Sequence, residues 1–186
     1  MSDKICQIEN YFYNNDKNLI HKWDHYFEIY DRHFKKYKNK DIVLLEVGVS
    51  RGGSLQMWSD YFGKGSKFFG IDIDPRCKEF ENENTKIFIG SQSDRKFLNY
   101  VKENIPHVDI LIDDGGHHMK SSALIAETTP LNGKCYQTGR APDLRNTNQL
   151  RLLRSSECQL ANMSERHFLY RPTLAFHPDS ALASQW

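Results

Sequence analysis

The sequence has no apolar stretch long enough to cross a lipid bilayer, so we expect no membrane-spanning segment. Its first residues, MSDKICQIENYFYNNDKN, are polar and lack the apolar core of a signal peptide. The four cysteines are scattered and form no C-x-x-C pair, which argues against a zinc ribbon or a C-x-x-C redox motif. These absences together predict a cytoplasmic protein with reduced thiols.

The sequence also lacks an excess of charge of either sign. Its 186 residues carry a formal net charge of +1, so no bulk electrostatic attraction to nucleic acid or to a membrane surface is expected. What is present is an ordinary globular composition, with 39% hydrophobic and 26% charged residues. A chain of this length is sufficient for one domain with a sizeable core.

Apolar runs alternate with helical patterns over the first 120 residues. Runs rich in Val, Ile, Leu and Phe predict strands at residues 41–48, 66–74, 85–90 and 108–116. Apolar residues spaced by three and four predict helices at residues 19–37 and around 55–62. Asp94 is placed to cap a further helix that ends before Pro106. This alternation predicts an α/β fold with a Rossmann-like parallel sheet and flanking helices.

The character of the sequence changes near Lys120. Arginine replaces lysine as the main basic residue, and the apolar runs become shorter. We interpret PLNGKCYQTG as the remnant of a turn and strand, LRLLR as a helical turn and PTLAFHP as a short strand. We therefore predict a domain boundary at residue 120, followed by a divergent or aberrant, poorly ordered tail (121–186) that leaves the sheet incomplete on its C-terminal side. A loop-rich lobe native to the fold is the alternative. An open edge of an incomplete sheet would favour a homo-oligomer.

The segment LLEVGVSRGGSLQMW, residues 44–58, has the pattern of a strand, a glycine-rich turn and a helix. Gly48 permits a tight turn and a close approach of a ligand to the backbone, and the amides that open the following helix favour negative charge. Ser50 stands where the dinucleotide motif G-x-G-x-x-G has its second glycine, which argues against NAD. Glu46, inside the strand, needs a cationic or hydrogen-bonding partner if it is buried.

Two later strand ends carry polar residues that fit the same ligand site. Asp72 lies 24 residues beyond Gly48 at the end of the second predicted strand, where a carboxylate can accept hydrogen bonds from ribose hydroxyls. The segment GSQSDRKF, residues 90–97, follows the third strand and could cover an adenine ring. The alternative is a plain βαβ protein in which Glu46 pairs with a basic side chain and Asp72 or Asp74 caps a turn.

The motifs EVGVSRGGS, GIDIDP, GSQSD and ILIDDGGHH resemble, in this order and spacing, those of class I S-adenosylmethionine-dependent methyltransferases. The nearest likeness is to the metal-dependent sugar O-methyltransferases of macrolide biosynthesis, related to cephalosporin hydroxylase-like proteins, and it covers about residues 15–120. The resemblance implies that residues 1–120 form an S-adenosylmethionine-binding domain. It implies cofactor contacts from Glu46 and Gly48 at the methionine part, Asp72 at the ribose, Gln92, Ser93 and Asp94 near the adenine, and also from Ser50 and Asp113.

The stretch IDDGGHH places several reactive side chains at the end of the fourth predicted strand. Methyl transfer to a hydroxyl needs alignment of donor and acceptor, a base, and stabilisation of the charge that develops on the oxygen. Asp113 can face the cofactor, Asp114 offers the hard oxygen that Mg²⁺ prefers, and His117 titrates near neutrality. The resemblance implies that Asp114 is a metal ligand and His117 the catalytic base, whereas His118 receives no role. Capping carboxylates and solvated turn histidines are the alternative.

One feature of the resembled family is missing from this sequence. In that family the next strand ends in a Glu-Asp pair that completes the metal site, and no such pair follows Met119 here. We expect an S-adenosylmethionine-dependent O-methyltransferase that acts on a hydroxyl of a sugar or another small molecule, with Mg²⁺ as a second cofactor if its site is complete. The alternatives are a truncated, catalytically inactive cofactor-binding module, an NAD-dependent oxidoreductase and, on the DDGGHH motif, a metal-dependent hydrolase.

Overall fold

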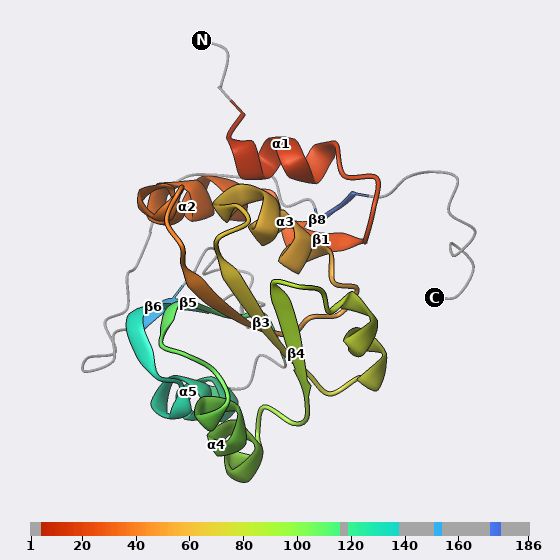
Figure 1. Ribbon diagram of the computed structural model, residues 1–186. Helices are drawn as coiled ribbons and strands as arrows, with labels where there is room; N and C mark the ends of the chain where they lie inside the picture. Colours follow the sequence, from red (N-terminus) through yellow and green to blue (C-terminus); the bar gives the residue numbers. More distant parts are fainter. Residues whose placement is uncertain (1–4, 116–118, 138–150, 154–171, 176–186) are drawn as a thin grey trace.

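A computed structural model gives the structure of residues 5–115, 119–137, 151–153 and 172–175. Figure 1 shows a twisted sheet with helices on both sides. In chain order the elements are α1 (Gln7–Tyr13), β1 (Ile20–Trp23), α2 (His25–Phe34), the 3-10 helix η1 (Lys35–Tyr37), β2 (Val43–Val47), α3 (Gly53–Phe62), β3 (Lys67–Asp72), the 3-10 helix η2 (Pro75–Phe80), β4 (Thr85–Ile89), α4 (Arg95–Glu103), β5 (Val108–Asp113), α5 (Met119–Thr128), β6 (Leu131–Gln137), β7 (Arg151–Leu153) and β8 (Pro172–Ala175).

The main sheet has the strand order β4-β3-β2-β5-β6-β7. All neighbours are parallel except β7, which is antiparallel to β6. The chain moves outward from β2 through β3 to β4, and then returns to the other side of β2 with β5. This reversal makes a topological switch point between β2 and β5. The predicted α/β fold with a Rossmann-like parallel sheet is confirmed.

Helices cover the two faces of the sheet and enclose two separate cores. In Figure 1, α1, α2 and α3 lie on one side of the sheet, and α4 and α5 lie on the other. Side chains of β2 alternate between the two cores, with Leu44 in the first and Leu45 and Val47 in the second. Glu46 therefore points to the same face as Leu44, toward α3. This burial on both faces explains why β2 is a continuous apolar run apart from Glu46.

An aromatic cluster joins α2 to α3 in the first core. The rings of Tyr30 and Trp58 meet edge to face with centroids 5.0 Å apart. Phe34 lies between Trp58 and Phe62, at centroid distances of 5.7 and 5.9 Å. The rings of Tyr30, Phe34 and Trp58 are completely buried, so this cluster supplies much of the packing between the N-terminal helices and the sheet.

The prediction of one helix over residues 19–37 is wrong in its first part. Ile20–Trp23 is strand β1, and α2 begins only at His25. The spacing of three between Ile20 and Trp23 suits a helix, but burial in this segment alternates along the chain as it does in a strand. The decisive contact is antiparallel pairing with β8, which lies far away in the sequence. Local periodicity carries no information about such a partner.

The sheet continues beyond residue 120. After α5, β6 pairs in parallel with β5, so the segment interpreted as a strand remnant is a strand of the main sheet. The predicted strand in PTLAFHP is present as β8. LRLLR is wrong as a helical turn, since Arg151–Leu153 form β7 against β6. The remainder of residues 121–186 lies outside the described part of the chain, so the domain boundary and the poorly ordered tail stay predictions.

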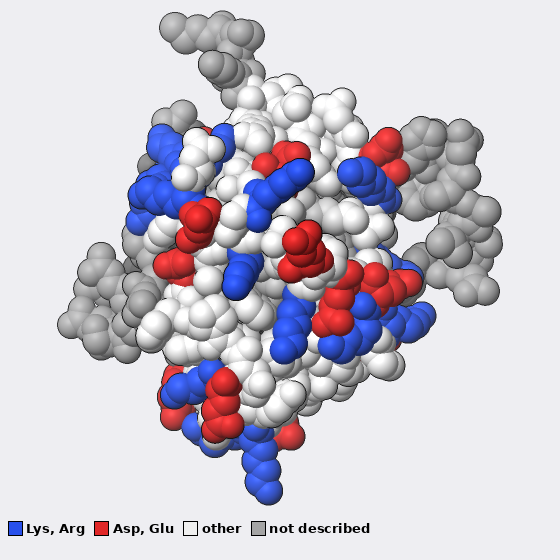
Figure 2. All heavy atoms as spheres, viewed as in Figure 1, with Lys and Arg blue, Asp and Glu red and all other residues white. Residues whose placement is uncertain are grey.

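The surface shows no gathering of one charge on the face in view. Lys and Arg are interspersed with Asp and Glu over that face (Figure 2). A bidentate ion pair on the surface, Arg95 with Glu127, links α4 to α5. Across the residues with described structure, every helix is too short or too polar to span a bilayer.

Phe34→Ala is expected to lower the free energy of unfolding by about 3–5 kcal/mol, because it leaves a cavity among the rings of the first core. Urea denaturation followed by circular dichroism measures this change. Tyr100→Ala is the control, since Tyr100 is 55% exposed and a surface truncation costs about 1 kcal/mol or less. Equal losses in the two variants would contradict the packing described for Phe34.

Candidate functional site

Gly48 lies where the ends of β2 and β5 come into contact. Its φ of +92° is in the region that favours glycine. A Cβ atom at Gly48 would lie 2.6 Å from the carbonyl oxygen of Asp114 and 2.9 Å from the Cα of Gly115. The Gly48 amide donates to the carbonyl of Ile71 in β3, at 2.8 Å. No other residue type fits this position without moving one of the two strand ends.

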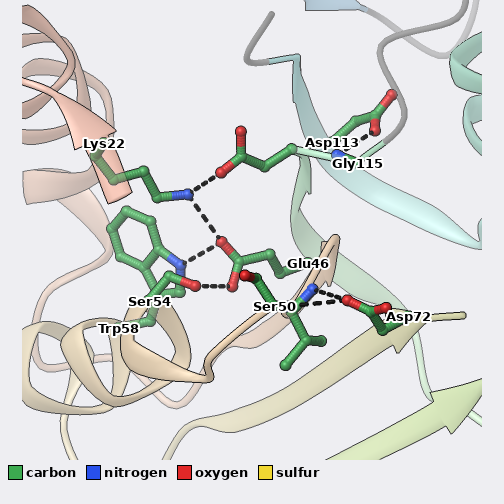
Figure 3. Close-up of polar contacts among 10 residues, drawn as sticks. Lys22, Glu46, Ser50, Ser54, Trp58, Asp72, Asp113 and Gly115 are labelled. Atoms are coloured by element: carbon green, nitrogen blue, oxygen red, sulfur yellow. Dashed lines mark hydrogen bonds and ion pairs between the residues drawn. The ribbon is translucent and has the colours of Figure 1, made fainter. Parts of the chain in front are cut away.

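Asp72 holds the turn that follows β2. Its Oδ2 accepts hydrogen bonds from the backbone amides of Val49 and Ser50, both at 2.9 Å, and its Oδ1 accepts from the amide of Asp74 at 2.9 Å. The first two bonds are drawn in Figure 3. Ser50 has a φ of +53°, which is unusual for a residue with a side chain, and these bonds stabilise that conformation. A carboxylate has about four acceptor sites, so about one remains on Asp72.

A pocket of about 370 Å³ opens at the carboxyl ends of β2, β3, β4 and β5. Open α/β sheets bind ligands at this place, next to the switch point. The pocket contains five of the residues predicted to form the site, namely Gly48, Asp72, Gln92, Ser93 and Asp114, together with Ile71, Ile73, Gly90, Ser91, Gly115 and Ser121.

Ile73 and Ser121 are among the lining residues that were not predicted from the sequence. Ile73 is 73% exposed, an unusual exposure for an isoleucine that lines a pocket. The only local signal was its place between two aspartates in GIDID. Ser121, on α5, has its Oγ 2.8 Å from the Oγ of Ser93. No sequence pattern indicated that Ser121 lines the pocket, because α5 reaches the pocket only through the packing of the helix on the sheet.

Glu46 is completely buried and has three partners. Its Oε1 accepts from Lys22 Nζ at 3.2 Å and from Trp58 Nε1 at 3.3 Å, and its Oε2 accepts from Ser54 Oγ at 2.7 Å. Figure 3 shows these three side chains converging on the carboxylate. The sequence called for a cationic or hydrogen-bonding partner of a buried Glu46, and the structure supplies both kinds. The cation is Lys22, so Glu46 pairs with a basic side chain, as in the plain βαβ alternative. Glu46 does not line the pocket, so its direct contact with a cofactor stays a prediction.

Lys22 joins two carboxylates from two strands. Besides Glu46 of β2, its ammonium pairs with Asp114 Oδ2, directly after β5. The Lys22 side chain is 2% exposed, whereas that of Asp114 is 23% exposed. Sequence reasoning missed Lys22 because it was assigned to a helix, and its partners lie 24 and 92 residues away.

The charges in this cluster shift the pKa values of its members. Burial alone lowers the pKa of the Lys22 ammonium, but the negative charges of Asp114 and Glu46 outweigh burial and raise that pKa well above its ordinary value. Burial raises the pKa of Glu46, and the hydrogen bond from Ser54 and the charge of Lys22 reduce this rise. Lys22 is therefore a cation throughout the neutral range.

The remaining predicted residues lie beside the pocket or outside the described structure. Asp113 is buried, and its Oδ1 accepts from the Gly115 amide at 3.3 Å. Asp94 caps α4, as predicted, by accepting from the amides of Lys96 and Phe97. Ser50 is exposed. None of the three lines the pocket, and their contacts with a cofactor stay predictions. His117 and His118 lie outside the described residues.

The described residues do not form a magnesium site. Among them, no group of three or more His, Cys, Asp or Glu side chains could hold a metal ion. Asp114, the predicted ligand, faces the Lys22 ammonium. Mg²⁺ usually takes one or two carboxylates together with waters or substrate oxygens, and the one available carboxylate already has a cation against it.

Gly48→Ala is expected to destabilise the protein more than Gly63→Ala. Both glycines have nearly the same φ, +92° and +91°, but a Cβ at Gly63 would meet nothing within 4 Å. Gly63, with a ψ of 174°, lies in a backbone region almost exclusive to glycine, so Gly63→Ala measures backbone strain alone, of order 1–3 kcal/mol. Gly48→Ala adds the collision with the backbone after β5 and should cost at least about 1 kcal/mol more. Thermal or urea unfolding compares them, and equal costs would show that the ends of β2 and β5 are not in contact.

Cys77 gives a test of the turn that depends on pH. Its thiol donates to the Ser50 carbonyl at 3.3 Å. Burial, with the charge of Asp72, raises the pKa of the Cys77 thiol to about 12. The unfolded thiol titrates near 8.5 and loses its proton first, so the free energy of unfolding should fall as the pH rises from about 8.5 toward 12. At about pH 8.5, alkylation of Cys77 followed by mass spectrometry should be far slower in the native chain than in urea. Equal rates would contradict the burial of the thiol.

Similar proteins were found by sequence and by structure, although no protein-family model matches the chain. The chain is 35% identical over 117 residues to demethylmacrocin O-methyltransferase of Streptomyces fradiae, covering 56% of this chain and 29% of that protein. It is 35% identical over 103 residues to mycinamicin VI 2''-O-methyltransferase of Micromonospora griseorubida, covering 50% of this chain and 25% of that protein.

A solved structure agrees with the sequence relatives. MycE methyltransferase from the mycinamycin biosynthetic pathway, in complex with Mg and SAH, superposes with a TM-score of 0.55 and 29% identity over 60% of this chain and 31% of that chain. The chain thus spans 25–31% of the length of these relatives. Over about half of its own length, the chain is similar in sequence to these O-methyltransferases and similar in fold to the MycE methyltransferase.

Proposed function

We propose that the pocket at the carboxyl ends of β2–β5 binds S-adenosylmethionine, and that the protein transfers the methyl group to a hydroxyl of a sugar or another small molecule. The observation that carries the proposal is the pocket itself. It lies at the switch point and brings together Gly48, Asp72 and Gln92 from three different strand ends. Relatives of this segment are named as O-methyltransferases of demethylmacrocin, of mycinamicin VI and of a rhamnosyl tetracenomycin C.

The pocket residues fit the parts of this cofactor. Its volume of about 370 Å³ falls in the range of small-molecule sites. The free acceptor capacity of Asp72 suits a ribose hydroxyl, and the exposed face of Ile73 offers an apolar surface for a planar base. Gln92 and Ser93 supply polar atoms at the same wall. Gly48, Gly90 and Gly115 leave backbone accessible to the ligand.

Charge distinguishes this cofactor from NAD. Two of the pocket's lining residues, Asp72 and Asp114, are carboxylates, and none of the lining residues in the described structure is Lys or Arg. S-adenosylmethionine carries a positive sulfonium, which supplies the methyl group, and an ammonium group, so negative walls attract it. A pyrophosphate would meet repulsion here. The negative lining of the pocket and the presence of Ser50 in place of a glycine both disfavour an NAD-dependent oxidoreductase.

The catalytic step is proposed from the sequence and the relatives. His117, which follows the pocket residue Gly115 by two positions in the sequence, would remove the proton from the acceptor hydroxyl. Mg²⁺ is present in the MycE structure, but the described residues of this chain supply only Asp114 to it, so no step is assigned to a metal. Residues 1–120 as the cofactor-binding domain, a sugar hydroxyl as the acceptor and a cytoplasmic location belong to the same proposal.

Calorimetric titration with S-adenosylhomocysteine tests cofactor binding. We expect micromolar affinity in the native chain and a loss of about tenfold or more in Asp72→Asn, which disturbs both the turn and the ribose site. Asp109→Asn is the matched control, because Asp109 also accepts a backbone hydrogen bond, from Val43 at 2.9 Å, but at the opposite end of the sheet. The affinity of Asp109→Asn for S-adenosylhomocysteine should stay within about twofold of that of the native chain.

Three outcomes would change the conclusion. If the folded chain does not bind S-adenosylhomocysteine, the proposal fails. Binding of NAD in its place would support the oxidoreductase. Binding without methyl transfer to any of a panel of sugar acceptors, with and without Mg²⁺, would leave the inactive cofactor-binding module as the function of this chain.

A further inference from the structure

A second hollow in the surface lies between α1 and α3, apart from the cofactor pocket. In Figure 1, α1 lies across the layer formed by α2 and α3, and it contacts both helices. The hollow, called here the α1 groove, has a volume of about 310 Å³ and is lined by one side of α1, by residues 14–17 and by Asp60 of α3. It shares no lining residue with the cofactor pocket, and the proposed methyl transfer gives it no role.

The lining of the α1 groove is rich in side-chain amides. Four of its eight lining residues are Asn or Gln, and the others are two aspartates, one lysine and one tyrosine. An amide group both donates and accepts hydrogen bonds, and a carboxylate accepts them. A sugar hydroxyl also donates and accepts, so neighbouring hydroxyls of a sugar ring can bond to amides and carboxylates side by side.

Tyr11 adds an aromatic ring to these polar groups. It packs against the first core and also lines the α1 groove, so packing fixes its position before a ligand arrives. Burial raises the pKa of Tyr11, and the negative charges of Asp60 and Asp16 add to this rise. Carboxylates from α3 and from the loop after α1 therefore lie near the same phenol. The negative face of an aromatic ring attracts the weakly positive C–H groups of a sugar.

The residues of the α1 groove keep hydrogen-bonding capacity for a ligand. Asp60 accepts one bond, from Gln7 Nε2 at 3.4 Å. Asn10 Oδ1 accepts from Asn14 Nδ2 at 3.2 Å, which leaves the amide hydrogens of Asn10 to donate. Within the described part of the chain, the Asp16 carboxylate accepts no hydrogen bond. These groups are open to hydroxyls that enter the groove.

The charges around the α1 groove balance. Asp16 and Asp60 carry two negative charges, and Lys17 carries a positive charge in the same lining. The ammonium of Lys38 donates to Oε1 of Gln7 and supplies a second positive charge beside the groove. With no excess of either sign, the groove has no electrostatic preference for an anion or a cation. A neutral ligand that is rich in hydroxyl groups fits this lining better than a charged one.

We propose that the α1 groove binds a neutral mono- or disaccharide, at a site separate from the cofactor pocket. The amides of α1 and the two carboxylates bond to the hydroxyls, and the Tyr11 ring lies against the C–H groups. The groove volume of about 310 Å³ is at the small end of the range for small-molecule sites. The proposal does not rest on methyl transfer, because none of the cofactor-pocket residues takes part in it.

Saturation-transfer difference NMR on the full chain tests this site with five neutral sugars, D-glucose, D-galactose, D-mannose, L-rhamnose and maltose. We expect at least one of them to bind with a dissociation constant of about 1 mM. Asn10→Ala/Asp16→Ala should weaken that binding about tenfold or more, because it removes hydrogen-bonding groups from the groove. Tyr11→Phe, which keeps the ring, should bind more tightly than Tyr11→Ala.

Asn99→Ala/Glu103→Ala is the matched control. It also removes one amide and one carboxylate from exposed positions, but from α4 on the other side of the sheet. Its sugar affinity should stay within about twofold of that of the native chain. Circular dichroism shows that each variant is folded before its titration is read.

Four results would overturn the proposal. The first is the absence of binding of all five sugars to the folded native chain, and the second is binding that survives Asn10→Ala/Asp16→Ala. The third is tighter binding of D-glucuronate or D-glucosamine than of every neutral sugar. The fourth is displacement of the sugar by saturating S-adenosylhomocysteine, which would place the sugar in the cofactor pocket. Failure of S-adenosylhomocysteine itself to bind would contradict the proposed function and leave the sugar results intact.

Discussion

The contact between the ends of β2 and β5 determines the geometry of the whole candidate site. Because Gly48 has no side chain, its backbone lies directly against that of Asp114 and Gly115. The amide of Asp114 donates to the carbonyl of Val47, at 2.9 Å, and so continues the ladder between the two strands. Asp72 and Asp114, at the ends of β3 and β5, thereby come to line the same pocket.

A second constraint is the burial of charge under that contact. Glu46 lies in the middle of an apolar strand, and a buried carboxylate is tolerated only with strong partners. Ser54 and Trp58 of α3 supply neutral donors, and Lys22 supplies the positive charge. The same ammonium pairs with Asp114. A residue needed to stabilise the core thus also sets the charge at the wall of the pocket.

Local sequence patterns were sufficient to predict the parts of the fold that depend on neighbouring residues. Strands β2 to β5, the cap at Asp94 and the parallel order follow from apolar runs, a capping residue and the alternation of strands with helices. The site was predicted where functional residues stand at strand ends, as Asp72 and Asp114 do. Prediction failed at β1, where a helical spacing concealed a strand whose partner, β8, is distant in the sequence.

The sequence by itself determined the class of fold, the glycine at the end of β2 and the need for a cationic or hydrogen-bonding partner beside Glu46. Each of these follows from the residues of one short segment and from the chemistry of burial. Only the tertiary structure decided that Lys22 is that cation, that Asp114 shares it and that Ile73 and Ser121 complete the pocket. The physical reason is that these contacts join elements far apart in the chain, and long-range packing leaves no trace in local periodicity.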